Sequence, residues 1–476
     1  MPDKEAVSED ILYASIREQA KLIGDKKLSP VALTEAYLDR LEKLGPKLGA
    51  VVTITQDLAR KEAAQAEKEI KDGKYKGPLH GIPYGVKDLL ATDGIPTTWG
   101  AEPYKDQVFD YDATVVKKLR EAGAVLVAKL AMVEIAGGFG YNNADASFTG
   151  PGRTPWNLDN WSGGSSSGPG AATAAALVSF SIGSETSGSI ITPAAYCGVS
   201  GLRPTYGRVS RHGAMALCWT LDKLGPMCRC ADDCGLVLAA IAGADPLDPT
   251  AVGKPFTYPE PMMEDAPKFK IGVLKGSATN VQAEVRKNFE ASLKVLGKFA
   301  DIEEDVAFPN MPWGPVISTI VNAEGASALR DLIESGDCKK LKSVSDQWGG
   351  YAASMVLAVD YLQAMRQRGP MKKALDELYS RYDALVAPSR GTVASPIDKD
   401  FDKAYPGVGG GPPVIPAGNL VGQPALSVPN GFGENDLPTG IQFTGRVWSE
   451  ARLLSIAHAY QQATEHHKKR PPFPPP

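Results

Sequence analysis

Short runs of strand character alternate with amphipathic helical segments along most of this chain, and no other feature restricts its fold as strongly. The runs contain valine, isoleucine and aromatic residues, which favour strands. Helical segments between strands are typical of an α/β protein, in which helices cover a largely buried sheet. We therefore expect an α/β fold. The strand-like runs are residues 81–88, 124–130, 179–183, 270–276, 382–388, 425–431 and 439–445.

The first 75 residues have a helical pattern instead. A helix start is predicted at Ser29, a capping residue, followed by Pro30 at the first helical position. Apolar residues then recur on one face, and charged residues occupy the other. We expect residues 1–75 to form a helical segment packed on a core of residues 76–470, followed by a proline-rich tail at 471–476. The apolar face comprises Leu33, Tyr37, Leu38, Leu41 and Leu44.

The composition is that of an ordinary globular protein. Of the 476 residues, 43% are apolar and 22% are charged, and the net charge is -4. The chain lacks the basic excess that a phosphate backbone attracts, so we expect no nucleic acid partner. No apolar run reaches the ~18–20 residues that span a bilayer, and the polar start is unlike a secretory leader. We therefore expect no membrane contact and a cytoplasmic protein.

The six cysteines are too sparse for a disulfide framework. Three of them form the run CRCADDC at 228–234, which could hold a metal only with a fourth ligand. No second cysteine pair or histidine pair lies nearby in the sequence. We therefore expect reduced cysteines that pack as small apolar side chains, and neither a metal nor an organic cofactor.

Residues 162–198 contain two serine- and glycine-rich turns that flank a helix and a strand, which is unlike a flexible linker. Small residues at 171–178 suit a closely packed helix, and the glycines before it leave backbone N–H groups free at its N-terminus. Neither phosphate-binding motif, GxxxxGK[ST] or GxGxxG after a strand, is present. The pattern favours acyl transfer by a serine nucleophile, with backbone N–H groups as an oxyanion hole.

A serine nucleophile needs a base, and two alternatives are open. The motif GSSSG matches a nucleophile elbow with Ser166 at its centre and His212 or His458 as base, although no strand precedes it. Lys87 is the other candidate base. It ends an apolar strand, where burial would lower its pKa. The competing interpretation is that Lys87 caps the strand or pairs with Asp88.

Three segments resemble, in order and spacing, the hallmarks of the amidase signature family. They are GIPYGVKD, GGSSSG and GSETSGSIITPAAYCGVSGLRPTYGRVS. The resemblance implies a Ser–cis-Ser–Lys triad, with Ser189 as nucleophile, Ser165 on a cis peptide as the bridging serine, and Lys87 as base. It covers nearly the whole chain, because YDALVAP, NLVGQPALSVPNGF and LPTGIQFTG match C-terminal landmarks of the family.

The resemblance also implies a fold, a reaction and a binding site. The fold is a single large α/β/α domain with a mostly buried, mixed central sheet covered by helices. The reaction is hydrolysis through an acyl-enzyme, so the expected partners are a small-molecule amide, ester or carbamate and water, with a homodimer as one open assembly. Backbone N–H groups of Thr186, Ser187 and Gly188 would bind the oxyanion, and Gly137 and Gly138 would border the substrate.

The chain departs from the family pattern at several positions. Glu185, Ser187 and Ile191 replace residues of D-x-G-G-S-I-R, so we expect the acidic–arginine pair behind the nucleophile to be absent. Gly137 replaces a methionine, which we expect to widen the pocket for a bulky or aromatic group. The expected pocket walls are Phe139, Tyr141, Met215, Leu217 and Trp219.

Two further functions stay open beside a free-standing amidohydrolase. One is the glutaminase subunit of a tRNA-dependent amidotransferase, which the signature region and the overall length resemble. Relatives of that type carry an acid shortly before the segment PANLAGLP to bind the amino-acid end of glutamine, whereas VGGGPPVIPAGN in this chain offers none. The other is a non-catalytic binding protein.

Overall fold

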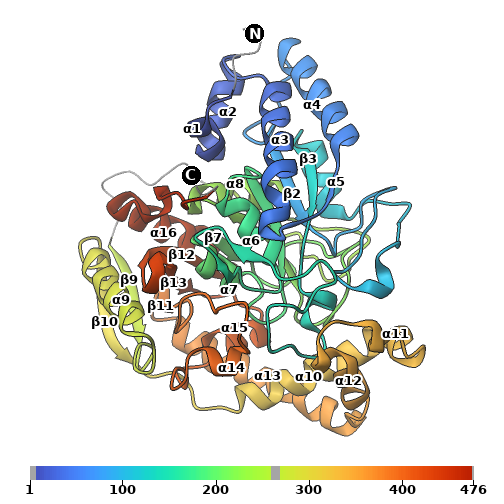
Figure 1. The fold of residues 1–476 in the computed structure, drawn as a ribbon. Coiled ribbons are helices and arrows are strands. Elements are labelled where there is room, and N and C mark those ends of the chain that lie inside the picture. The colour runs from blue at the N-terminus through green and yellow to red at the C-terminus, as the bar shows by residue number, and fades with distance from the viewer. Residues whose placement is uncertain (1–6, 259–267, 474–476) are drawn as a thin grey trace.

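A mixed sheet, eleven-stranded within the described residues 7–258 and 268–473, forms the centre of the computed structural model (Figure 1). Its strands follow the order β1-β3-β2-β6-β8-β7-β12-β13-β11-β9-β10. β2 pairs in parallel with β3 and β6, whereas β6 and β8 run antiparallel. The bounds are β1 Val51–Ile54, β2 Pro83–Lys87, β3 Val125–Leu130, β6 Phe180–Glu185, β7 Ser200–Arg203, β8 Lys223–Cys228, β9 Phe269–Leu274, β10 Ala300–Val306, β11 Ala384–Pro388, β12 Ala425–Phe432 and β13 Pro438–Thr444, with β4 Arg153–Thr154 and β5 Asn157–Trp161 in a separate two-stranded sheet.

All the strand-like runs predicted from the sequence are strands of this sheet, namely β2, β3, β6, β9, β11, β12 and β13. The α/β fold with a mixed, mostly buried sheet is thereby confirmed. The sequence did not predict β1, β7, β8 and β10. β10 lies at the edge of the sheet and exposes acidic residues, and β8 carries a proline in its interior, so neither has the apolar run of a typical strand.

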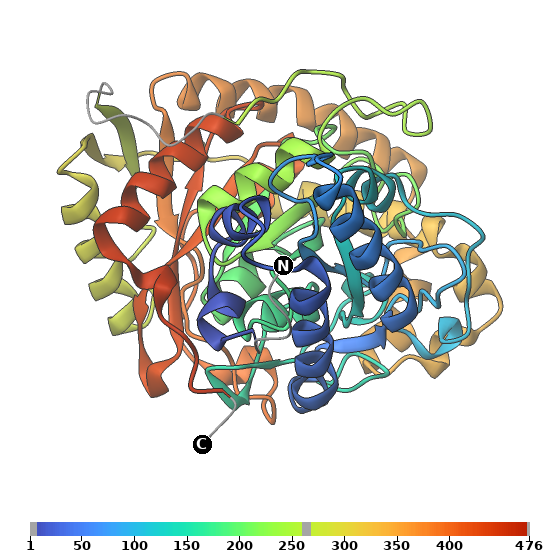
Figure 2. The same ribbon diagram turned by 90° about the horizontal axis from the view of Figure 1, so that it is seen from above.

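Helices cover both faces of the sheet. Successive residues of a strand point to opposite faces of the sheet. The contacts of two adjacent residues of β7 therefore show which helix covers each face. The Ser200 hydroxyl accepts a hydrogen bond from Gln461 on α16, whereas a side chain at Gly201 would meet Ala194 on α7. Figure 2 shows α8 and α16 over the first of these faces, beside the N-terminal helices. The helix bounds are α1 Glu9–Tyr13, α2 Ile16–Gly24, α3 Pro30–Leu48, α4 Gln56–Lys71, α5 Thr114–Glu121, α6 Ser167–Ala174, α7 Ile191–Cys197, α8 Ala231–Ile241, α9 Ala283–Leu296, α10 Trp313–Ala328, α11 Arg330–Glu334, α12 Val344–Ala353, α13 Ala358–Tyr379, α14 Phe401–Ala404, α15 Val414–Val421 and α16 Glu450–Thr464.

The N-terminal helices α1 to α4 lie together at one end of the molecule, at the top of Figure 1. α3 begins as predicted, because the Ser29 side chain accepts a hydrogen bond from the Ala32 N–H and Pro30 occupies the first turn. The same segment supplies β1, which pairs with β3 at the edge of the main sheet. The division of the chain at residue 75 stays a prediction, and the end of the predicted tail, 474–476, lies outside the described residues.

Two further findings concern the chain as a whole. In the parts of the chain that the structure describes, no helix combines the length and the apolar character needed to cross a membrane. All six cysteines are free thiols. Four of them, Cys218, Cys228, Cys234 and Cys338, lie in the main apolar core, which confirms their predicted use as small apolar side chains.

Candidate active site

Lys87 ends strand β2 and is fully buried. Its Nζ atom donates hydrogen bonds to Ser165 Oγ at 2.7 Å and to Ser184 Oγ at 2.9 Å. The Asp88 carboxylate forms an ion pair with Lys129 instead, at 3.2 Å. Among the described residues, Lys87 forms no ion pair at all. The alternative interpretation, in which Lys87 pairs with Asp88, is therefore wrong.

The surroundings of Lys87 favour its neutral form. Burial lowers the pKa of Lys87 from its ordinary value to about 7, although the carboxylates of Asp222 and Glu185 act in the opposite direction. Removing an ammonium group from water costs more free energy here than the two carboxylates return. Burial therefore favours the uncharged amine, and such an amine can accept a proton.

Ser165 lies in the loop between β5 and α6, and the Gly164–Ser165 peptide bond is cis, as the family resemblance implied. Its side chain is fully buried and accepts the hydrogen bond from Lys87. The next residue joins the two serine turns, because the Ser166 N–H donates to the Ser189 carbonyl at 3.3 Å. The structure thus brings Lys87, Ser165 and the Ser189 turn together from three separate parts of the chain.

Ser189 lies in the turn between β6 and α7 and is partly exposed, so a substrate can reach it. Gly188 before it has φ +95°, a conformation that favours glycine. Ser187 is exposed, whereas Thr186 is buried and its hydroxyl donates a hydrogen bond to Asp222 at 2.6 Å. Consecutive backbone N–H groups in a turn of this kind can surround an anion.

Glu185 forms a buried acid–arginine pair behind this turn. Its carboxylate lies 2.8 Å from Arg203 on β7, and the Asn419 amide donates a further hydrogen bond at 2.8 Å. The expectation that such a pair is absent is wrong. Arg203 supplies the guanidinium, although this chain has Ile191 where the family pattern has an arginine. The second carboxylate oxygen accepts hydrogen bonds from the Ile190 and Ile191 N–H groups, at 2.9 and 3.0 Å, and holds the start of α7. Burial alone would raise the pKa of Glu185, but Arg203 and Asn419 lower it to about 2.

Two polar residues of this site were not predicted from the sequence. Ser184 on β6 accepts a hydrogen bond from Lys87, which lies on the neighbouring strand β2. Asp222 accepts hydrogen bonds from the Thr186 hydroxyl and from two backbone N–H groups of the preceding loop, and so fixes the orientation of Thr186. Ser184 lies within the segment GSETSG and Asp222 lies beyond it, but the contacts of both depend on the pairing or packing of distant segments.

A cavity of about 220 Å³ adjoins the Ser189 turn. Ser184 and Thr186 form one part of its wall. Three of the predicted wall residues, Met215, Leu217 and Trp219, form another part. The cavity therefore presents apolar side chains close to the turn that carries Ser189.

Gly137 does not widen the pocket as expected. It has φ +76°, and a side chain there would overlap the ring of Tyr141, which fills the space beside it. A side chain at Gly138 would lie 2.9 Å from Leu217 Cδ1, so Gly138 borders the wall of the small cavity. Phe139 packs against the glycines of α12 instead, and neither Phe139 nor Tyr141 is among the described residues that line the small cavity.

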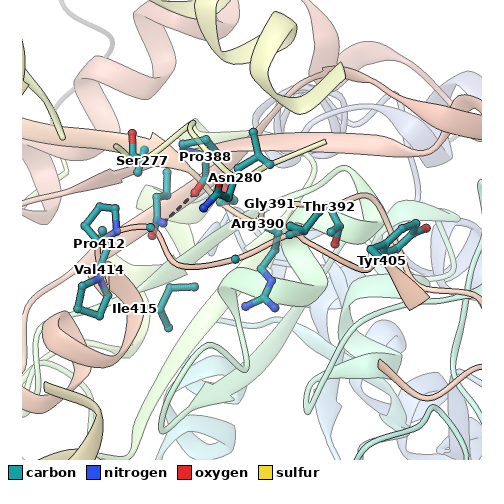
Figure 3. Close-up of a pocket in the computed structure, with 18 of the residues that line it drawn as sticks. Ser277, Asn280, Pro388, Arg390, Gly391, Thr392, Tyr405, Pro412, Val414 and Ile415 are labelled. Carbon is teal, nitrogen blue, oxygen red and sulfur yellow. Dashed lines mark hydrogen bonds between the residues drawn. The ribbon is translucent and has the colours of Figure 1, made fainter. Parts of the chain in front are cut away.

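A larger cavity, of about 410 Å³, has Arg390, Thr392, Tyr405 and Ile415 in its wall (Figure 3). Trp161 in its wall contacts the first turn, because a Cβ atom on Gly164 would lie 2.7 Å from Trp161 Cζ2. Ile415 in its wall contacts the second turn, where a Cβ atom on Gly188 would lie 3.3 Å from Ile415 Cγ2. One wall residue of this cavity therefore lies beside each of the two glycines that precede the serines.

The histidine-dependent alternative finds no support in this geometry. The Ser166 side chain is buried, and its hydroxyl donates a hydrogen bond to the Ser184 carbonyl at 3.2 Å. His212 lies beside Tyr111, with 5.6 Å between ring centroids, and His458 lies on α16. Within the described ranges, no histidine forms a hydrogen bond with Ser166. The nucleophile elbow predicted at Ser166 therefore lacks a base.

The mixed sheet and the buried lysine beside two serine turns are the fold and the site expected of an amidohydrolase of the amidase signature family. The family model described as Amidase matches residues 32–454, which are most of the chain. The chain therefore belongs to the amidase signature family, as the sequence resemblance implied.

The relatives include both amidotransferase subunits and amidases. A glutamyl-tRNA(Gln) amidotransferase subunit of Moorella thermoacetica is 36% identical, over 97% of this chain and 99% of its own. The native peptide amidase of Stenotrophomonas maltophilia has a TM-score of 0.84 and 31% identity, over 96% of this chain and 98% of its own. The corresponding amidotransferase subunit of Thermotoga maritima has a TM-score of 0.77 and 29% identity, over 97% of both chains.

These relatives contradict the predicted partners. The sequence predicted a small-molecule amide, ester or carbamate and water, no nucleic acid and no membrane, with a homodimer as an option. Relatives that are 36% and 35% identical over 97% of this chain are, by name, subunits of a glutamyl-tRNA(Gln) amidotransferase. The net charge of one subunit does not report the charge of a whole complex, so a value of -4 does not exclude nucleic acid.

Proposed function

We propose that this chain hydrolyses a carboxamide or a related acyl bond through an acyl-enzyme on Ser189. The observation that carries the proposal is the buried Lys87, whose Nζ lies 2.7 Å from Ser165 Oγ and which forms no ion pair with any described residue. Because burial lowers the pKa of Lys87 to about 7, this side chain can act as a general base near neutral pH.

The proposed mechanism begins with two proton transfers. Lys87 accepts a proton from Ser165, and Ser165 accepts one from Ser189, so that Ser189 Oγ attacks the carbonyl carbon. The negative charge that develops on the carbonyl oxygen is stabilised by backbone N–H groups of the turn 186–189. The C–N bond then breaks, and the relay returns a proton to the leaving amine. Water attacks the acyl-enzyme with help from the same relay and releases the acid.

The proposal extends to esters and carbamates. Each of these substrates passes through a tetrahedral intermediate with an oxyanion, so the same relay and the same turn serve esterase and urethanase activity. The small cavity, with Met215, Leu217 and Trp219 in its wall, offers an apolar surface to one side of the reacting bond. We place the reaction in the cytoplasm.

Substitution of the proposed base and nucleophile tests the mechanism. Lys87→Ala and Ser189→Ala should each lower kcat/KM for an aryl amide by about 1,000-fold or more, because members of such a unit act together. Lys27→Ala, which alters an exposed lysine, is the control and should keep full activity. Full activity in Lys87→Ala would exclude the proposed base, and full activity in Ser189→Ala would exclude the proposed nucleophile.

A second candidate function is favoured by the relatives named as subunits of glutamyl-tRNA(Gln) amidotransferase. A glutaminase subunit would need its partner subunits and would prefer glutamine. Against it, the segment VGGGPPVIPAGN has no acidic side chain to bind the amino group of glutamine. Hydrolysis of aryl amides by the purified chain alone supports the free-standing amidohydrolase. Activity that appears only with partner subunits and glutamine supports the second candidate.

A further inference from the structure

The larger cavity contains one charged side chain among the described residues that line it, Arg390. Arg390 follows β11 and extends toward the side of the pocket on which Ile415 also lies (Figure 3). The rest of the described wall is apolar or neutral, with no aspartate or glutamate. Its other residues include Trp161, Tyr196, Asn280, Thr392, Tyr405 and Gln442.

Arg390 has no partner within the described ranges, unlike two buried arginines elsewhere in the chain. Arg203 pairs with Glu185 at 2.8 Å, and Arg208 pairs with Glu450 at 2.9 Å. Arg390 forms no ion pair or side-chain hydrogen bond with any described residue, and it is exposed to the solvent in the cavity. Its five N–H donors are therefore available to a ligand.

The Arg390 guanidinium also lies on the side of the first serine turn. Its charge lies close enough to Tyr141 to oppose the rise that burial causes in the pKa of that phenol. The Tyr141 hydroxyl oxygen would lie 3.1 Å from a Cβ atom on Gly164, the residue before Ser165. A ligand bound to Arg390 therefore lies on the same side of the molecule as the first serine turn.

The small cavity lacks this unbalanced charge. Its arginine, Arg211, lies 3.5 Å from the carboxylate of Asp248, and both residues are part of the wall. Asp222 adds a second carboxylate there. A positive potential with no compensating acid in the described wall is thus a property of the larger cavity, and it selects an anion.

We propose that Arg390 binds a carboxylate on the acyl part of the substrate, so that the preferred substrate is the monoamide of a dicarboxylic acid. Guanidinium and carboxylate form two parallel charge-assisted hydrogen bonds, which fix both the position and the orientation of the acid. The described wall of the cavity offers no carboxylate for an ammonium group. The substrate therefore carries the carboxylate without an α-amino group. This inference rests on the proposed amidohydrolase function and names its substrate class.

Three amides of equal chain length test the proposal. Glutaramate carries the carboxylate, glutamine carries the carboxylate and an ammonium group, and pentanamide carries a methyl group in place of the carboxylate. The wild-type protein should show a kcat/KM for glutaramate about 10- to 100-fold above that for pentanamide, since a hydrogen-bonded charge pair is worth that factor. Glutamine should be a poorer substrate than glutaramate. Equal kcat/KM values for glutaramate and pentanamide would overturn the proposal.

Variants of Arg390 separate binding from chemistry. Arg390→Met should lower kcat/KM for glutaramate by about 10- to 100-fold and leave pentanamide within about twofold. Arg390→Lys keeps the positive charge but loses the planar guanidinium that can form two parallel hydrogen bonds. Its kcat/KM for glutaramate should therefore lie between those of the wild type and Arg390→Met. An equal loss on both amides, or no loss on either, would overturn the proposal. An unchanged melting temperature in both variants shows that the fold is intact.

A binding measurement keeps this inference distinct from the proposed mechanism. In the Ser189→Ala variant, calorimetry should detect glutarate binding that weakens as salt is added and that Arg390→Met abolishes. Binding that survives Arg390→Met would overturn the inference about Arg390, whatever the chemistry. If glutarate binds as expected but Ser189→Ala keeps full amidase activity, the proposed mechanism fails and the anion site remains.

Discussion

Lys87 owes its proposed role to its surroundings rather than to its residue type. It is a lysine with no exposed surface, its ionic neighbour Asp88 is already paired with Lys129, and its amine contacts two serine hydroxyls. Because Lys87 is buried and forms no ion pair with any described residue, the charged form is poorly stabilised. The pKa of Lys87 accordingly falls to about 7, chiefly because of burial.

The pH dependence of activity follows from this pKa. Lys87 must lose its proton to act as base, so kcat/KM should rise with pH through a midpoint near 7 and reach a plateau by about pH 9. The measurement is a pH–rate profile from pH 5 to 9, with an amide whose chemical step limits the rate. A flat profile over that range would contradict the proposed base.

Ser184 is a positioning residue in this account. Its hydroxyl accepts a hydrogen bond from Lys87 Nζ at 2.9 Å. Ser184→Ala should lower kcat/KM about tenfold and move the acid limb of the pH profile to lower pH, because the ammonium form loses an acceptor. Ser181→Ala alters the same strand without touching Lys87 and is the matched control. A fall in activity with an unmoved pH midpoint would argue for a merely structural role.

The residues that the sequence identified are those that belong to motifs. Lys87, Ser165 and Ser189 occupy fixed positions in short segments that resemble a known family, and the structure places these segments side by side. Ser184 and Asp222 escaped prediction because their contacts depend on strand pairing and on a loop from elsewhere in the chain. Contacts between segments that are distant in the chain leave no pattern in the local sequence.

At the scale of elements, the turn between β6 and α7 is held by Glu185. The carboxylate accepts hydrogen bonds from two N–H groups at the start of α7 and pairs with Arg203 on β7. One side chain therefore connects the turn to the sheet. A buried carboxylate with a charged partner and several donors keeps its charge in the fold. Removal of that charge should therefore affect the stability of the whole turn.

Glu185→Gln should lower the free energy of unfolding by about 3 kcal/mol, because it leaves Arg203 buried without a counter-ion. Chemical denaturation at pH 7 measures the change. Glu303→Gln, which breaks an exposed pair with Arg381, is the control and should cost less than about 1 kcal/mol. Equal effects from the two substitutions would contradict the buried role of Glu185.

The same pair gives the fold an acid-sensitive component. The folded-state pKa of Glu185, about 2, lies below its ordinary value of 4.5, so its contribution to stability is fully present above pH 4.5. That contribution is lost as the pH falls from 4.5 toward 2. The difference in unfolding free energy between wild type and Glu185→Gln should therefore shrink over this range.

Elements with a strong local pattern were predictable, and those without one were not. α3 has a cap, a proline at its start and an apolar face, and it begins where predicted. β10 is an acidic edge strand, and β8 has an internal proline, so both lack the apolar run that marks a strand. Their strand form is imposed by their neighbours in the sheet.

At the scale of the whole molecule, one sheet connects segments from all parts of the chain. β1 comes from the N-terminal segment, and β9 and β10 lie at the opposite edge of the sheet. The order of strands could not be predicted, because pairing between distant segments leaves no periodic signal in either one. The sequence therefore predicted the class of fold but not its topology.

The N-terminal segment should be required for folding. β1 pairs with β3, and α4 packs on β3 with buried Ala59 and Ala63. A chain that begins at residue 76 exposes these surfaces and should aggregate or lose its cooperative thermal transition. A chain that begins at residue 7 is the control and should unfold as the full chain does. A stable, active 76–476 fragment would contradict this account.

The central claim is that Ser189 is the nucleophile and that Lys87 activates it. The most direct measurement is reaction of the purified chain with a fluorophosphonate, followed by peptide mapping by mass spectrometry. We expect one adduct, on Ser189, which forms much more slowly in Lys87→Ala. An adduct on Ser166, or labelling of Ser189 at an unchanged rate in Lys87→Ala, would contradict the account.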